Sequence, residues 1–270
     1  NFYRVYSGIN ENSAEAAEAF LRTIISTDEY PLTRLKNTNA TEMSKVLENS
    51  YRAMNIAFIQ EWTEFADVAG VDLYEVISAI QMRPTHKNIM RPGLGVGGYC
   101  LTKDPLLASW SAQNLFDAGP LTQSEVAVEI NDQMPLYSFE VLKEKYGESL
   151  AEKRILFLGV SYLNDVGDTR FTPVELIYDC LNETGAGIAL HDPYISIWEE
   201  KDKAVDQKLR EENVDIVIVT VSHKQFTSEH YINYLNSIKP ELVLDTLGCY
   251  LGHEQKFNSN IELKTIGKGV

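Results

Sequence analysis

The sequence predicts an α/β protein, with a helical first half and a Rossmann-like parallel sheet in the second half. In residues 1–150, apolar side chains recur at helical spacing over long stretches. In residues 151–270, short β-branched runs alternate with helical stretches. The composition, 44% hydrophobic and 23% charged, is that of a globular chain, and 270 residues are enough for two modest domains. We therefore expect two domains, divided near residue 150.

Helices account for most of the expected first half. The predicted helices cover residues 13–26, from 39 or 41 to about 69, 73–80, 105–114 and 122–146. Gly70 is a candidate C-cap for the long second helix, which has an apolar set too broad for one face. We therefore expect this helix to be buried on more than one side.

The second half has the pattern of a parallel sheet. Its expected strands are residues 155–160, 188–190, 214–221 and 242–244, with a helix at 173–183. Such short, fully apolar strands are typical of sheets that helices cover on both faces.

Composition excludes several classes of function. The chain has 24 Lys and Arg against 39 Asp and Glu, a formal charge of −15, which disfavours nucleic acid and anionic membrane as partners. No apolar run approaches the ~20 residues that span a bilayer. The three scattered cysteines suit neither a disulfide framework nor a zinc site, so no metal and a reducing, cytoplasmic compartment are expected.

The glycine-rich segment 91–100 is the first candidate site. Four glycines within 93–98 allow the backbone to approach a ligand closely. Cys100 precedes the helix expected at Pro105, where a helix N-terminus favours a reactive thiolate, and Asp104 is a candidate general base. The alternative is structural, because Asp104 and Pro105 also suit the N-cap and first position of a helix, and a single cysteine is often a small buried residue.

The long helix provides a second candidate group. Lys45, Asn49 and Arg52 share one helix face, which is ordinarily a solvated face. In a helix this apolar, however, Lys45 and Asn49 could stabilise a thiolate or an oxyanion.

The third candidate is the loop after the first strand of the second half. Thr172 and Glu175 form a capping-box pattern with Pro173 at the first helical position, which delivers Arg170 to a helix N-terminus at the carboxyl edge of a sheet. Ligands bind at such edges, and helix N-termini favour anions. A surface ion pair is an equal alternative for Arg170. The loop has no GxGxxG pattern of a standard dinucleotide turn.

Taken in order, these segments resemble the nucleotide-sugar 6-dehydrogenases, the UDP-glucose/GDP-mannose dehydrogenase family. The resemblance covers nearly the whole chain and rests on Lys45-x-x-Glu48-Asn49, Gly-Val-Gly-Gly-Tyr-Cys at 95–100, Lys103-Asp104 and Gly-Asp-Thr-Arg at 167–170. His191-Asp192-Pro193 and Ser222-His223-Lys224 fit less specifically.

The resemblance implies two NAD-dependent oxidations of a sugar C6 alcohol to a carboxylate. Cys100 would be the nucleophile that forms a thiohemiacetal and then a thioester, Lys45 and Asn49 would hold the C6 oxygen, and Asp104 would help water attack. The implied substrate-binding residues are Lys45, Asn49, Arg91, Gly95, Gly97, Tyr162 and Leu163. The implied cofactor-binding residues are Cys100, Lys103 and Arg170. The resemblance also implies a homodimer through the helix around Lys45.

Three departures from the family bear on function. The family's N-terminal NAD-binding domain is missing before Arg4, so we expect NAD to be bound mainly by a domain absent from this chain, which alone would be inactive. Leu163 and Leu247 stand where the family usually has cations, and Tyr99, often His or Ser in the family, lies beside the nucleophile. A UDP-sugar is expected in preference to a GDP-sugar. The alternative function is a non-catalytic, dimerising nucleotide-sugar-binding module. A cysteine hydrolase fits poorly, because no pattern places a histidine base near Cys100.

Overall fold

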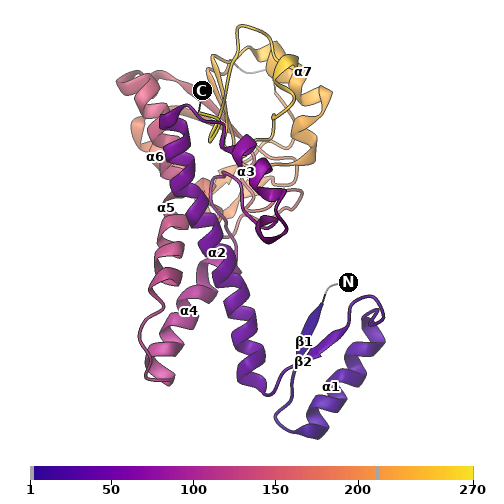
Figure 1. The fold of residues 1–270 in the computed structure, drawn as a ribbon. Helices are drawn as coiled ribbons and strands as arrows, with labels where there is room; N and C mark the ends of the chain where they lie inside the picture. The colour runs from indigo at the N-terminus through magenta and orange to yellow at the C-terminus, as the bar shows by residue number, and fades with distance from the viewer. Residues whose placement is uncertain (1–2, 211–212, 270) are drawn as a thin grey trace.

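The computed structural model describes residues 3–210 and 213–269 (Figure 1). These residues form a small N-terminal unit, a column of long helices and a parallel sheet that has helices on both faces. The predicted fold class is confirmed.

The N-terminal unit contains two strands that the sequence analysis did not foresee. Strands β1 (Arg4–Tyr6) and β2 (Leu32–Arg34) pair in parallel and are connected by helix α1 (Glu11–Ile24). The helix begins two residues before the predicted start because the side chain of Asn10 caps it, accepting the amide of Ser13 at 2.9 Å.

Helix α2 (Thr38–Ala69) is the axis of the helical column. The side chain of Asn37 accepts the amide of Ala40 at 2.9 Å and caps its start, and Gly70 ends it in the left-handed conformation, with φ of 67°. The predicted C-cap is therefore confirmed. Helix α3 (Leu73–Gln81) and the short 3₁₀ helix η1 (Pro84–His86) follow.

Helices α4 (Tyr99–Leu115) and α5 (Thr122–Tyr146) pack along α2. Small residues at the α2–α5 contact, including Ala53, Ala57 and Ala127, allow the two helices to approach closely. Helix α5 has its predicted bounds. The predicted start of α4 is wrong by six residues, since the helix already begins after Gly98 and Pro105 lies inside it.

One face of α2 is apolar and exposed, although the helix is buried on more than one side, as predicted, in one cluster with α3 and another with α5. Six large side chains on this face are at least 46% exposed and fall within about 100° of the helix circumference at 3.6 residues per turn. We call them the α2 stripe: Met43, Leu47, Tyr51, Phe58, Trp62 and Phe65. The opposite face, with Asn49 and Ala53, is buried against α4 and α5.

The sheet has the order β4-β3-β7-β8-β9, and all its pairs are parallel. Its strands are β3 (Arg154–Leu158), β4 (Gly187–His191), β7 (Ile216–Val219), β8 (Leu242–Asp245) and β9 (Glu262–Thr265). The last of these was not predicted. Because β4 follows β3 in the chain but lies on the outer side of it, the winding direction reverses between β3 and β7.

Each face of the sheet has its own core, which explains why the strands are apolar throughout. Phe157 and Ile218 pack under α5 and α6 (Val174–Thr184), whereas Leu158 and Val219 pack under α7 (Glu229–Ile238). Smaller elements complete this half: the short strands β5 (Ile197–Trp198) and β6 (Lys203–Ala204) and the 3₁₀ helices η2 (Gly147–Glu152), η3 (Glu199–Lys201), η4 (Lys224–Thr227) and η5 (Glu254–Lys256).

Asp67, near the end of α2, joins the helical column to the C-terminal segment. Its carboxylate accepts the amide of Gly267 at 3.0 Å, the amide of Gly269 at 2.9 Å and the hydroxyl of Tyr137 at 2.9 Å. We call this group the Asp67 latch. It fixes the sheet relative to both α2 and α5.

Candidate active site

A hydrogen-bonded series of side chains connects α2 to α4. Lys45 Nζ donates to Asn49 Oδ1 at 3.2 Å, and Asn49 Nδ2 donates to Asp104 Oδ2 at 2.6 Å. Lys103 Nζ lies 3.6 Å from Asp104 Oδ1. Asn49 is 1% exposed and Asp104 is 9% exposed, whereas Lys45 and Lys103 are exposed. The buried amide of Asn49 therefore links Lys45 to the Asp104 carboxylate, which also pairs with Lys103.

Cys100 is the second residue of α4 and is exposed. The sequence analysis placed it before the helix and made Asp104 a candidate N-cap, which is wrong because Gly98 is the N-cap. With Cys100 and Asp104 in one helix, the thiol and the carboxyl share a face one turn apart. The first turn of α4 contains no acidic side chain, so the helix dipole there is not opposed locally.

The glycine-rich loop packs against the loop that follows β3, which we call the β3 loop (residues 159–173). A Cβ on Gly97 would lie 2.2 Å from the carbonyl oxygen of Phe171 and 2.8 Å from Cβ of Tyr162. Gly98 has φ of 76°, and a Cβ there would lie 3.0 Å from the ring of Tyr162. These two positions therefore require glycine, because the two loops approach each other closely and Gly98 is left-handed.

Asn131 of α5 holds the middle of the glycine-rich loop. It accepts the amide of Val96 at 2.8 Å through Oδ1 and donates to the carbonyl of Val96 at 3.0 Å through Nδ2. Gly95 lies against the backbone of Asn131, where a Cβ would be 3.0 Å from its carbonyl oxygen. Sequence reasoning missed Asn131, whose helical spacing does not distinguish it from an ordinary polar residue of α5.

Arg170 lies above the start of α4. Its guanidinium is 5.7 Å from the ring centroid of Tyr99, and Tyr99 meets Phe171 edge-on at 4.7 Å. Asp168 accepts three side-chain hydrogen bonds from Arg170, which raises the pKa of Arg170 and lowers the pKa of Asp168. The expected ion pair of Arg170 is therefore present, and its expected contact with a bound anion stays a prediction.

The other predicted residues of this region occupy the same edge of the sheet. Leu163 is 46% exposed, and Arg91 is exposed. Leu247 packs partly buried against the sheet core, 3.6 Å from where a Cβ of Gly93 would be. The predicted capping box is wrong, because Pro173 is the N-cap of α6 and Glu175 does not take part. Thr172 Oγ1 nevertheless accepts the amide of Val174 at 3.4 Å and donates to the carbonyl of Ser161 at 3.4 Å.

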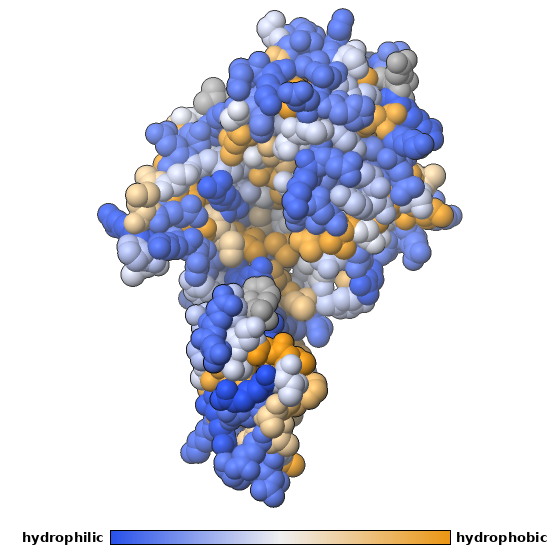
Figure 2. Space-filling view, turned by 90° about the vertical axis from the view of Figure 1, so that its right-hand side faces the viewer, coloured by the Kyte–Doolittle hydropathy of each residue, from blue (hydrophilic) through white to orange (hydrophobic). Residues whose placement is uncertain are grey.

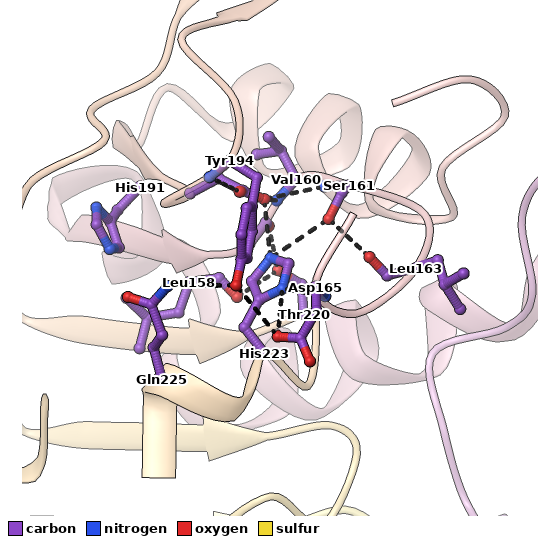
Figure 3. A network of polar contacts seen from close by, with 12 residues as sticks. Leu158, Val160, Ser161, Leu163, Asp165, His191, Tyr194, Thr220, His223 and Gln225 are labelled. Atoms are coloured by element: carbon purple, nitrogen blue, oxygen red, sulfur yellow. Dashed lines mark hydrogen bonds and ion pairs between the residues drawn. The ribbon is translucent and has the colours of Figure 1, made fainter. Parts of the chain in front are cut away.

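Two buried polar side chains lie under the β3 loop, where the winding of the sheet reverses. Asp192 follows β4 and is 0% exposed, and His223 follows β7 and is 1% exposed. His223 Nε2 lies 3.2 Å from Asp192 Oδ2 and 3.3 Å from Ser161 Oγ (Figure 3). The sequence analysis gave these residues no role. The signal that could have found them is a polar residue within four positions of the end of each of two apolar strands, because parallel strands end at one edge of a sheet.

The part of the chain that the structure describes, residues 3–210 and 213–269, contains neither a candidate metal-ion cluster nor a membrane-spanning helix. Within it, His, Cys, Asp and Glu side chains nowhere form a group of three or more suited to a metal ion. Within it, too, every helix is too short or too polar to cross a bilayer.

The fold and the site together define a class of protein. A doubly wound parallel sheet presents its ligand-binding edge to a helical column that carries an exposed cysteine, a lysine and a buried amide–carboxylate pair. Residues 39–133 match the central domain of the UDP-glucose/GDP-mannose dehydrogenase family, and residues 156–251 match the UDP binding domain of the same family. The chain belongs to this family.

Curated relatives share this assignment at moderate identity. The chain is 30% identical over 246 residues to the UDP-N-acetyl-D-mannosamine dehydrogenase of Methanocaldococcus jannaschii, which covers 90% of this chain and 54% of the relative. It is 29% identical over 258 residues to the NDP-N-acetyl-D-galactosaminuronic acid dehydrogenase of Ralstonia nicotianae, covering 92% of this chain and 56% of that protein. The chain thus spans a little over half the length of these relatives.

Solved structures confirm the fold. The UDP-D-ManNAc dehydrogenase of Pyrococcus horikoshii superimposes with a TM-score of 0.81 at 24% identity, over 99% of this chain and 61% of that one. The UDP-glucose dehydrogenase of Pyrobaculum islandicum gives a TM-score of 0.73 at 22% identity, over 94% and 56%.

Proposed function

We propose that the chain is the part of an NAD-dependent nucleotide-sugar 6-dehydrogenase that carries the nucleophile and binds the sugar nucleotide, so that a UDP-sugar is oxidised to a UDP-uronate. The observation that carries this proposal is the series Lys45–Asn49–Asp104, with Cys100 one helical turn before Asp104. A non-catalytic module would have no need to keep a buried amide between a lysine and a carboxylate.

In this mechanism Cys100 captures the C6 aldehyde. Its sulfur adds to the aldehyde carbon, and the carbonyl electron pair moves onto the oxygen, giving a thiohemiacetal. Lys45 Nζ and Asn49 Nδ2 are the donors available to that oxygen, and donors placed where charge develops stabilise the transition state. Covalent capture also keeps the aldehyde from reaching water between the two oxidations.

Asp104 acts after the second oxidation, when C6 is the carbonyl carbon of a thioester with Cys100. It accepts a proton from water as the water oxygen attacks the thioester carbonyl carbon, the carbon–sulfur bond then breaks, and Cys100 leaves as a thiolate. The product is the C6 carboxylate. The hydrogen bond from Asn49 and the ion pair with Lys103 orient the Asp104 carboxyl for this step.

The cofactor fits the side of the site where α4 begins. NAD, when bound, supplies the hydride acceptor for each of the two oxidations. The exposed side chains Lys103 and Arg170 flank Cys100 at the positive end of a 17-residue helix, which suits the anionic pyrophosphate of a dinucleotide. The ring of Tyr99 keeps Arg170 above this helix end.

The sugar nucleotide fits the edge where the two loops meet. The backbone of Gly95 and Gly97, the ring of Tyr162 and the exposed side chains Arg91 and Leu163 border this edge. A UDP-sugar is favoured because residues 156–251 match the UDP binding domain of the family. Since Leu247 packs into the core and Leu163 carries no charge, Arg91 is the cation there that we assign to the phosphates.

We infer from two exposed surfaces that a second copy of the chain and an NAD-binding domain pack against it in the active enzyme. The α2 stripe exposes large apolar side chains along a 32-residue helix, and we assign it to a homodimer contact. The N-terminal unit, at the front of Figure 2, exposes Tyr3, Phe20 and Ile24 around a two-stranded parallel sheet. Parallel sheets normally lie within larger, covered sheets, so we assign this unit to the border of an NAD-binding domain outside this chain.

The test is to trap the thioester in the full-length enzyme. In Asp104→Asn, mixing with NAD and the UDP-sugar should give an intact mass increased by the acyl group, and digestion should place it on Cys100. Cys100→Ala is the matched control and should show no adduct and no uronate. If UDP-sugar binds but Asp104→Asn gives neither adduct nor NADH, the chain functions as the non-catalytic module.

A further inference from the structure

The front part of the β3 loop, residues 159–168, is held by the side chains of Asp192 and His223, which follow the strands β4 and β7. Asp192 Oδ2 accepts the amides of Val160 at 2.9 Å and Ser161 at 3.2 Å, close to where the loop begins. His223 Nδ1 accepts the amide of Asp165 at 2.8 Å, at the far side of the turn. Figure 3 shows the His223 ring between Ser161 and Asp165 of the loop.

These bonds define which nitrogen of His223 carries the proton. Because the amide hydrogen of Asp165 points at Nδ1, that nitrogen acts as an acceptor, and the ring proton is on Nε2. Nε2 then donates to Asp192 Oδ2 at 3.2 Å, while Ser161 Oγ, 3.3 Å away, donates its own proton to the carbonyl of Leu163 at 3.1 Å. Every donor in the group is thus paired with an acceptor.

The arrangement contains Ser, His and Asp but does not have the geometry of a nucleophilic triad. A triad needs the serine at one ring nitrogen and the carboxylate at the other, whereas Ser161 and Asp192 both meet Nε2 of His223. All three side chains are also buried, with at most 1% exposure. The group therefore positions the backbone.

The positioned backbone faces the proposed nucleotide site. Tyr162, between the two anchored ends, contacts Gly97 and Gly98, and Leu163 lies exposed beside it. We propose that Asp192 and His223 are positioning residues that set the conformation of residues 160–165 and so present Tyr162 and Leu163 to the sugar nucleotide. The ligand side of this inference depends on the proposed function.

The experiment compares two replacements of His223 by hydrogen exchange. In His223→Asn, the side-chain oxygen can take the place of Nδ1, whereas in His223→Gln the amide reaches the place of Nε2 and leaves the Asp165 amide without its acceptor. We expect the Asp165 amide to exchange at least tenfold faster in His223→Gln and to stay protected in His223→Asn, with β7 amides such as Val217 unchanged in both.

The matched control is His191→Gln. His191 is equally buried next to Asp192 but pairs with Tyr231, so this variant should leave the Asp165 amide protected. If Asp165 loses protection in His223→Asn, keeps it in His223→Gln, or loses it equally in His191→Gln, the inference is overturned. Either His223 variant decides the question if the other does not fold.

Binding of UDP separates this inference from the proposed function. By calorimetry, His223→Gln should weaken UDP binding at least tenfold, and His191→Gln should change it less than twofold. Wild-type chain that fails to bind UDP would contradict the proposed substrate, while the exchange pattern still decides whether His223 and Asp192 hold the loop. Unchanged UDP binding in His223→Gln, with a released Asp165 amide, would overturn the link to the ligand.

Discussion

Replacing Gly97 with alanine tests whether the glycine-rich loop and the β3 loop are in tight contact. The new methyl group would lie 2.2 Å from the carbonyl oxygen of Phe171 and 2.8 Å from Cβ of Tyr162. Neither neighbour is the flexible end of a side chain, so the two loops must separate to admit it. Gly97 does not have a positive φ, so the effect comes from the contact and not from backbone strain.

The expected cost follows from this overlap. Overpacking a well-filled contact costs about 1–3 kcal/mol. Since 1 kcal/mol corresponds to about 2–4 °C in Tm for chains of roughly this size, Gly97→Ala should lower Tm by about 2–12 °C. Because Tyr162 moves with the loop, the variant should also lose affinity for UDP.

Differential scanning calorimetry provides the assay, and Gly119→Ala is the matched control. A Cβ on Gly119 would meet no atom within 4 Å, so alanine there should be neutral or stabilising by about 0.4–1 kcal/mol. Equal Tm values for Gly97→Ala and Gly119→Ala would refute the argument that the two loops touch.

Three further predictions address the latch, the thiols and acid stability. Asp67→Ala leaves the amides of Gly267 and Gly269 without their acceptor and should cost about 1–3 kcal/mol in urea unfolding; no shift in midpoint would contradict the latch. Iodoacetamide at pH 8 should label exposed Cys100 well before Cys249, since burial, aided by Asp245, raises the pKa of Cys249 to about 12; mass spectrometry showing equal rates would exclude this. Burial alone would raise the pKa of Asp192, but hydrogen bonds from His223 and two amides outweigh it and lower the pKa. The stability it contributes is therefore full above its unfolded pKa of about 3.9 and is lost as pH falls through the lower folded value. The urea midpoint should drop between pH 6 and pH 3, and drop less in Asp192→Asn; parallel drops would show that other groups are responsible.

Elements that depend on local signals were predictable from the sequence. Helix α5 has its predicted bounds, 122–146, and Gly70 ends α2 as expected, because helical spacing and the left-handed glycine act within a few residues. The start of α4 was not predictable in this way. Asp104 and Pro105 have the local pattern of a helix start, but the turn at Gly98, fixed by the distant β3 loop, begins the helix six residues earlier.

In the candidate site, too, contacts within one helix were predictable, and contacts between distant segments were not. Helix periodicity placed Lys45 and Asn49 together, but only the packing of α2 on α4 brings Asn49 within 2.6 Å of Asp104, 55 residues away. Likewise, Asp192 and His223 are 31 residues apart and meet because β4 and β7 both lie next to β3. Contacts of this kind depend on strand order, which no local pattern encodes.

The length of α2 limits how the gene for this protein can change. The helix is about 48 Å long at 1.5 Å per residue and carries Asn49 near its middle and Asp67 near its end. Inserting one residue between them would turn the two ends by about 100°, so that Asn49 and Asp67 could not both keep their partners. A whole turn would restore the orientation but would move Asp67 about 5.4 Å along the axis, too far for its hydrogen bonds of 2.9–3.0 Å. Insertions and deletions between Asn49 and Asp67 should therefore be rare, while changes in length accumulate in the loops.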